Sequence, residues 1–141
     1  MRNLLFLLFF CSFIYAKGQQ QLAWPILQLT TYETLNQDGQ WIYKPRFPKI
    51  LEDQYANERV AISGYLIPTD VSAKRYALSK NPFTSCFFCG NAGPETVILL
   101  EFEEAPGRFA TDKYVAVEGI LRLNKGEDGL FFTIKKTEIT D

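Results

Sequence analysis

The sequence predicts a small all-β protein: a five-stranded barrel like that of the OB fold, with an N-terminal hairpin and a Pro/Gly-rich loop that carries cysteines. Five segments rich in β-branched and aromatic residues follow residue 59, separated by short runs of turn-forming residues. Gly64 and Gly119 stand inside two of these segments. A glycine weakens a strand unless the chain bends there, as it does where a sheet coils into a barrel. A small β-sandwich is the alternative.

The N-terminal part of the chain predicts extended structure and one hairpin. Residues 22–35 are rich in β-branched and aromatic side chains, which favour an extended segment. Asp-Gly at 38–39 separates this run from the apolar residues 41–43, and this dipeptide favours a two-residue hairpin turn. Pro45 and Pro48 should end the second strand, because proline has no N–H to donate to a ladder. Residues 49–59 should form a turn or a short helix.

The barrel strands are expected in the second half of the chain, at residues 60–68, 75–79, 96–102, 113–123 and 130–139. Apolar residues alternate at 60–68 and 113–123, as they do in strands with one buried face. Pro68 should end the first of these strands, and the glycine-containing residues 124–129 should turn the chain before the last. The connection between the second and third strands is irregular.

Residues 1–18 have the features of a secretory signal peptide. Arg2 precedes an almost wholly apolar run, LLFLLFFCSFIYA, which is too short to span a bilayer. Cleavage after Gly18 is expected, with cleavage after Ala16 as the alternative. An uncut leader that anchors the protein, or lipidation at Cys11, would hold it at a membrane instead. We therefore expect an exported, periplasmic protein.

Cleavage would leave residues 19–141 as a single domain, starting with a polar spacer at 19–21. Two of the 15 basic residues and none of the 16 acidic ones would be lost, so the net charge would change from −1 to −3. An acidic surface does not suit a phosphate backbone, so we do not expect nucleic acid as a partner, although Lys44 and Arg46 are interleaved with aromatic residues. The mature chain contains no second apolar run long enough to span a membrane. A protein of the cell envelope is the expected kind of partner.

Cys86 and Cys89 are the residues best suited to chemistry. They form a Cys-x-x-Cys-Gly motif in a chain that contains no histidine. Two thiolates on one turn make half of a tetrahedral zinc site. Gly90 can take the left-handed conformation, which turns backbone N–H groups toward the sulfurs. Glu95, Asp70 or a second subunit would have to complete the coordination.

Three other interpretations of the cysteine pair stay open. A disulfide across two residues is often strained and reducible, which would suit thiol–disulfide exchange. In thioredoxin-like proteins, however, this motif opens a helix, whereas here Gly90, Gly93 and Pro94 follow and shape a loop. No basic residue stands beside the pair to lower the pKa of a thiol. A permanent structural disulfide, and a pocket for another ligand under the loop, are the remaining interpretations.

Phe87 and Phe88 separate the two cysteines. Adjacent residues of an extended stretch point to opposite sides, so we expect one ring in the core and the other exposed, as a partner surface or a lid. The chain has no Gly-rich phosphate loop, no Gly-x-Ser-x-Gly elbow and no histidine base. The sequence therefore favours a non-enzymatic protein.

Three stretches, VAISGYLIP, YALSK and SCFFCGNAGPETVILL, resemble a family of exported bacterial proteins of unassigned function. Many of its members read Gly-Tyr-x-x-Pro, then an apolar strand, then a Cys-x-His-x-Pro-rich-Asn-Gln signature. Placed on this pattern without a gap, Cys86 matches the family cysteine and Pro94 its last proline. Glu95 matches its asparagine and Thr96 its glutamine. The resemblance extends over residues 22–139.

The chain departs from the family signature at one point. Phe88 stands where the family has histidine, and Cys89 follows, which resembles a Bacteroidetes-type branch that reads CFFCGxAGPE. If the family Cys-x-His is a metal site, this exchange keeps two soft or borderline ligands. Members often lie near zinc-uptake genes, so the resemblance implies metal handling, with zinc as the first candidate.

These inferences give one expected function and two alternatives. We expect an exported, non-enzymatic binding protein that handles a transition metal, with Cys86 and Cys89 as thiolate ligands and Glu95 as a third ligand or an acceptor beside them. The alternatives are a thiol–disulfide redox protein, and a structural or interaction module with a permanent Cys86–Cys89 disulfide. Metal binding and redox chemistry both need the two sulfurs side by side and reachable from solvent.

Overall fold

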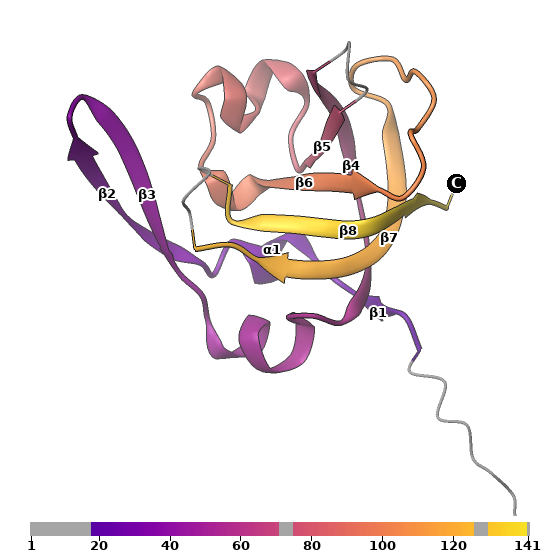
Figure 1. Ribbon diagram of the computed structural model, residues 1–141, viewed down its shortest axis with the longest axis horizontal. Coiled ribbons are helices and arrows are strands. Elements are labelled where there is room, and N and C mark those ends of the chain that lie inside the picture. The colour runs from indigo at the N-terminus through magenta and orange to yellow at the C-terminus, as the bar shows by residue number, and fades with distance from the viewer. Residues whose placement is uncertain (1–17, 71–74, 126–129, 141) are drawn as a thin grey trace, which may run out of the picture.

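The computed structural model describes residues 18–70, 75–125 and 130–140, without the side chain of Cys89. Five strands close into a barrel: β4 (Arg59–Asp70), β5 (Arg75–Ser79), β6 (Val97–Phe102), β7 (Tyr114–Leu123) and β8 (Phe132–Ile139). Their order around the barrel is β4-β5-β6-β8-β7, and β7 pairs back onto β4. Only the β6–β8 pairing is parallel among these five (Figure 1). The predicted OB-like barrel is thereby confirmed.

The barrel core consists of inward-facing apolar side chains from every strand. Alternate residues of β7 are buried, including Val115, Val117 and Leu121, because successive side chains of a strand point to opposite faces. Phe131 and Phe132 are the largest fully buried side chains. Burying a side chain of this kind contributes about 1.5–3 kcal/mol to the free energy of unfolding.

Gly64 and Gly119 are required by close packing between strands. A Cβ at Gly64 would lie 2.7 Å from the carbonyl oxygen of Ser79 on β5. A Cβ at Gly119 would lie 2.5 Å from the carbonyl oxygen of Lys135 on β8, where the β7–β8 register shifts between Glu118 and Ile120. Both strand glycines thus let a neighbouring strand approach, which a coiled sheet requires.

Replacing Gly119 with alanine should destabilise the barrel. The added methyl group would overlap backbone oxygen of β8, and overpacking of this kind costs about 1–3 kcal/mol. Gly107→Ala is the matched control, because a Cβ at Gly107 meets no atom within 4 Å. Urea unfolding should show a lower midpoint for Gly119→Ala and an unchanged or higher one for Gly107→Ala. Equal midpoints would contradict this packing.

Two N-terminal expectations were wrong. β1 (Gln20–Gln21) is not a free spacer: it pairs in parallel with the start of β4. The segment expected to be wholly extended begins with a short helix, α1 (Trp24–Leu27), with a proline in its first turn, a position that proline tolerates. Tertiary contacts account for this helix, since Leu27 is buried and the Trp24 indole N–H donates to the Ser63 carbonyl at 2.8 Å.

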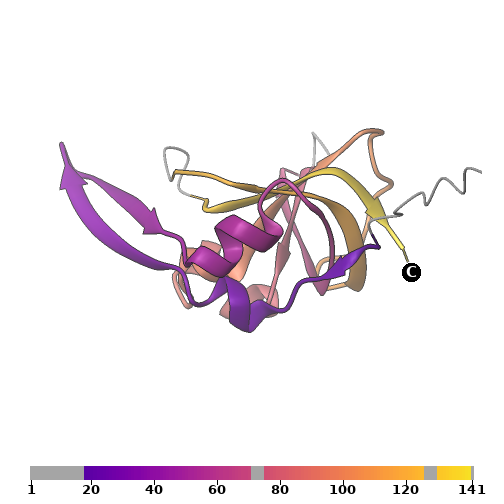
Figure 2. The same ribbon diagram turned by 90° about the horizontal axis from the view of Figure 1, so that it is seen from below.

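The predicted hairpin is present as β2 (Thr31–Gln37) and β3 (Gln40–Arg46). Its two-residue turn has Asp38 at φ 53° and Gly39 at φ 84°, as a type I′ turn requires. The hairpin projects from the barrel, and its tip lies far from every other element in both views (Figures 1 and 2). A short helical segment, Leu51–Tyr55, follows it and confirms the expected helix.

Prolines end strands less often than expected. β3 continues through Pro45 but ends at Arg46, before Pro48, and β4 runs through Pro68 with a shift of register before Asp70. A proline is tolerated in a strand where its missing N–H would face away from the partner strand.

Several expectations fall outside the described residues. They include the whole of the leader up to residue 17 and most of the predicted turn at 124–129. In the part of the chain that the structure covers, no helix is both long and apolar enough to cross a bilayer.

Candidate functional site

The cysteine loop, residues 82–96, connects β5 to β6 and is built from three short 3-10 turns: Phe83–Ser85, Phe87–Cys89 and Pro94–Thr96. Asn91 ties its halves together, since its N–H donates to the Cys86 carbonyl at 3.3 Å and its side-chain amide donates to the Thr84 carbonyl at 2.8 Å. The loop is therefore a compact unit rather than an extended strap.

Cys86 lies in the interior of this loop and has an exposed fraction of 0%. For Cys86, the expectation of a sulfur reachable from solvent is therefore wrong. A thiol packs well as a small apolar group, and the turns on either side of Cys86 fold the loop over it. The Cys89 side chain, the other half of the predicted pair, lies outside the described residues.

The three residues expected to shape the loop have distinct places in it. Gly90 ends the second turn in the left-handed conformation, with φ 75°, which suits glycine. Gly93 leaves space for the side chain of Glu95, because a Cβ at position 93 would overlap the Glu95 carboxylate. Pro94 is buried and opens the third turn.

Glu95 folds back over Gly93 into a partly buried position. Its Oε2 atom is buried and accepts no hydrogen bond from the described part of the chain. An unpaired buried carboxylate oxygen is costly, so this atom is suited to a cation or to a donor from outside. Asp70, the alternative third ligand, instead lines a hollow beside β6 in which no cysteine-loop residue takes part.

A metal site is not assembled by the side chains that the structure describes. Among them, no three His, Cys, Asp or Glu residues lie close enough together to hold an ion. Since Cys89 is outside that set, the Cys86–Cys89–Glu95 combination stays a prediction.

Aromatic contacts join the hairpin to the barrel and to the cysteine loop, and the sequence analysis missed them. Tyr32 on β2 lies with its ring centroid 5.5 Å from that of the buried Phe131. Tyr43 on β3 meets Tyr32 edge-on at 5.6 Å and Phe87 of the cysteine loop at 6.1 Å. Such pairs contribute about 0.5–1.5 kcal/mol each beyond their buried area. Trp41 and Tyr43 are two residues apart and therefore share one face of the hairpin. This spacing is the sequence feature that could have indicated the aromatic contacts.

The outer part of the hairpin carries large exposed apolar side chains among polar ones. Trp41 has an exposed fraction of 64% and Leu35 one of 48%. Phe88 is 44% exposed, while the neighbouring Phe87 is half-buried against Tyr43. We call the hairpin aromatics Tyr32, Trp41 and Tyr43, together with Phe87 and Phe88, the aromatic arm.

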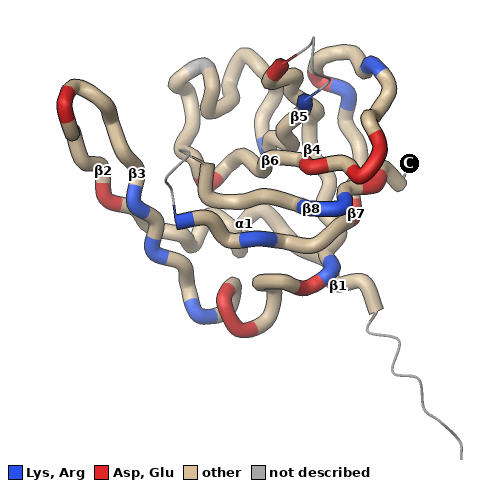
Figure 3. The backbone as a smooth tube through the Cα atoms, in the orientation of Figure 1, with Lys and Arg blue, Asp and Glu red and all other residues tan. Residues whose placement is uncertain are grey.

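Acidic and basic residues of the hairpin lie on different parts of it. Arg46 on β3 forms an ion pair with Glu33 on β2, and Lys44 stands directly across from the same Glu33. In Figure 3 the red segments of the hairpin lie on β2 and at the turn, and the blue segments lie on β3. The ion pair with Glu33 partly neutralises the basic strand, which weakens its attraction for a phosphate backbone.

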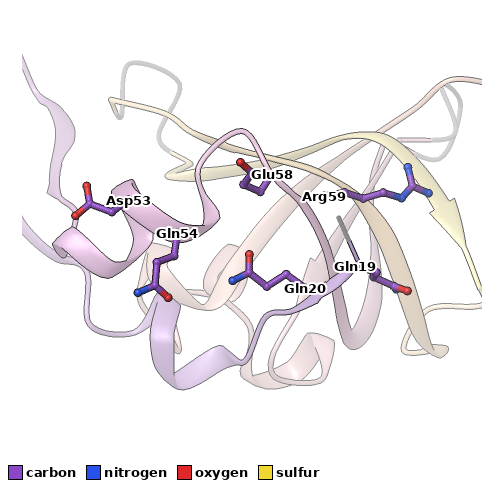
Figure 4. A pocket seen from close by; sticks show the side chains of 7 residues that line it. Gln19, Gln20, Asp53, Gln54, Glu58 and Arg59 are labelled. Carbon is purple, nitrogen blue, oxygen red and sulfur yellow. The ribbon is translucent and has the colours of Figure 1, made fainter. Parts of the chain in front are cut away.

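Three hollows on the described part of the surface have no residue of the cysteine loop in their lining. One, of about 530 Å³, is lined by residues 18–20 with Asp53, Gln54, Glu58 and Arg59 (Figure 4). The Arg59 guanidinium is 3.3 Å from carboxylates of Glu118 and Glu138, so its charge is already engaged. The chemistry of this hollow does not define a ligand.

The fold and the site together define a small all-β barrel protein of OB-like topology with an aromatic arm. No protein-family model, curated protein or solved structure matches the chain. Its function therefore has to be argued from its own residues.

Glu95 should control the titration of Tyr32. Burial, then the negative charge of Glu95, then Tyr43 raise the pKa of Tyr32 above its ordinary value of 10.0. Glu95→Gln should therefore lower this pKa toward 10.0 without reaching it, because the burial remains. NMR titration of the tyrosine rings measures the change, with Glu33→Gln as the control on the same hairpin.

The raised pKa of Tyr32 has a consequence for stability. The unfolded chain releases this proton near 10.0, while the folded protein retains it to higher pH. The contribution of Tyr32 to the free energy of unfolding should therefore fall as the pH rises through the pKa of Tyr32 in the folded protein. This fall should be less steep in Glu95→Gln. An unchanged pKa in Glu95→Gln would show that the carboxylate does not act on Tyr32.

Proposed function

We propose that this is an exported, non-enzymatic binding protein that holds a protein partner of the cell envelope through the aromatic arm. The observation that carries the proposal is the exposure of Trp41 and Leu35 on a hairpin that projects from the barrel. These two side chains lie on opposite faces of the hairpin, because Leu35 pairs with Ile42 and Trp41 with Asn36 in the ladder. Large apolar side chains exposed on both faces of a projecting hairpin are typical of a surface that a partner covers. Tryptophan and tyrosine are the residues that most often carry the binding energy of protein interfaces.

The arm has the anatomy of a binding surface. Its base is fixed, because Tyr32 and Tyr43 pack against Phe131 and Phe87. Within the described residues no aromatic pair involves its outer half, and Trp41 and Leu35 there are exposed to a partner. A fixed base limits the ordering entropy that binding would cost.

Site-specific photo-crosslinking tests this function. A photoreactive phenylalanine analogue in place of Trp41 should give one discrete adduct with an envelope protein in intact cells of the native host. Tyr114 is the matched control, because it is also aromatic and 59% exposed but lies on barrel strand β7. Adducts of equal and diffuse pattern at both positions would contradict a binding role for the arm.

Metal handling is the second candidate, and a separate observation favours it. Glu95 holds a buried carboxylate oxygen without a described partner, six residues after Cys89 and in the same loop as Cys86. A divalent cation would neutralise that oxygen, and zinc accepts carboxylate and thiolate ligands together. The burial of Cys86 means that the cysteine loop would have to open for the ion to enter.

Cobalt(II) binding tests the metal candidate, because thiolate–cobalt charge-transfer bands report sulfur ligation directly. The reduced mature protein should bind one equivalent with these bands. Cys89→Ser should abolish them, and Glu95→Gln should weaken binding about tenfold or more. Glu101→Gln, an exposed acid on β6, is the control. Absence of the bands in the parent protein would exclude Cys86 and Cys89 as ligands.

A further inference from the structure

The free edge of β2 is the one strand edge of the hairpin that is open to pairing. In a two-residue type I′ hairpin, the residues flanking the turn exchange hydrogen bonds, and such pairs then alternate along the ladder. With Gln37 across from Gln40, the backbone groups of Tyr32, Thr34 and Asn36 point away from β3. No hydrogen bond to these outward groups is found within the described residues.

The opposite edge of the hairpin is blocked. The same alternation points the backbone of Pro45 outward from β3, and proline has no N–H to offer a new strand. Prolines and charges on an edge prevent pairing with other chains. β2 has no proline and a single charge, Glu33, which is paired with Arg46 of its own hairpin.

We propose that two copies of this chain pair through their β2 edges, antiparallel about a two-fold axis at Thr34. This inference goes beyond the proposed function, because it concerns the backbone edge of β2 and not the exposed side chain of Trp41 on β3. The pairing would join the two hairpins into a four-stranded sheet, order β3-β2-β2-β3. It would add about six backbone hydrogen bonds, two from each outward-facing residue pair.

In this register, the side chains of β2 are compatible with those of β2 in the second copy. Glu33 lies across from Leu35 of the second copy, so the two carboxylates do not face each other, and like charges directly opposite would destabilise the pair. Leu35 comes diagonally beside Leu35 of the second copy, because each lies across from the other copy's Glu33, two residues before that copy's Leu35. Exposed aliphatic surface of Leu35, now 48% exposed, is thereby covered.

The proposed sheet also explains why so exposed a hairpin persists. A two-stranded hairpin is marginally stable by itself, whereas sheets of three or more strands with an apolar face are stable. All seven residues of β2 are exposed in the single chain. Pairing would therefore stabilise the half of the hairpin that the aromatic contacts at its base do not reach.

Sedimentation of the purified mature protein tests the pairing. A two-fold dimer is expected, and Thr34→Pro should make it monomeric, because the lost N–H faces the second copy and serves no bond within the hairpin. Thr34→Val keeps the N–H and the branched shape, so it should remain dimeric with the same unfolding midpoint. A monomer at all concentrations, or a dimer unaffected by Thr34→Pro, would overturn the inference.

Disulfide trapping tests the register independently of whether Thr34→Pro folds. Across a hydrogen-bonded antiparallel pair the Cα atoms are about 5.5 Å apart, within the range that a disulfide spans. Thr34→Cys should therefore cross-link to its own copy under mild oxidation. Thr31→Cys should not do so alone, but should when mixed with Gln37→Cys. Cross-linking of Thr31→Cys to itself would overturn the register.

The two proposals fail separately. If the purified protein is a monomer while position 41 still cross-links to a different envelope protein, self-pairing is wrong and the binding function stands. If the dimer forms through β2 but position 41 gives no adduct with another protein, the arm serves self-association and the heterologous partner is wrong.

Discussion

The contact between the base of the hairpin and the barrel is the interaction on which the rest of the molecule depends. A two-stranded hairpin is at best marginally stable in water by itself. Here Tyr32 reaches Phe131 in the barrel core, and Tyr43 reaches Phe87 in the cysteine loop. Phe131 in turn packs against Phe132, both fully buried. The hairpin is thus tied at one end to the buried core of the barrel.

The same contacts relate the arm to the cysteine loop. Phe87 stands directly after the buried Cys86 and contacts Tyr43. A movement of the cysteine loop would therefore change the contact at the base of the hairpin. Glu95, at the other end of the loop, raises the pKa of Tyr32. A ligand in the cysteine loop and a partner at the hairpin would thus both lie next to the contacts of Tyr32 and Tyr43.

Local patterns predicted most of the fold but little of the site. The residue types at the Asp-Gly turn, 38–39, and at the strand glycine Gly119 indicate the local backbone geometry by themselves. The hairpin and the coiled sheet could therefore be predicted. The helix at Trp24 and the burial of Cys86 could not, since both result from tertiary packing that periodicity does not encode. The position of Glu95 depends on space left by a glycine two residues earlier, which spacing alone cannot reveal.

Hydrogen exchange of the hairpin amides tests most directly whether the arm is held from its base. The Glu33 and Lys44 N–H groups, which face each other across the ladder beside Tyr43 at the base of the hairpin, should exchange slowly in the parent protein. Tyr43→Ala, which removes the contacts to Tyr32 and Phe87, should make them exchange rapidly while the amides of β7 stay protected. Rapid exchange of the hairpin in the parent, or protection unchanged in Tyr43→Ala, would contradict the account.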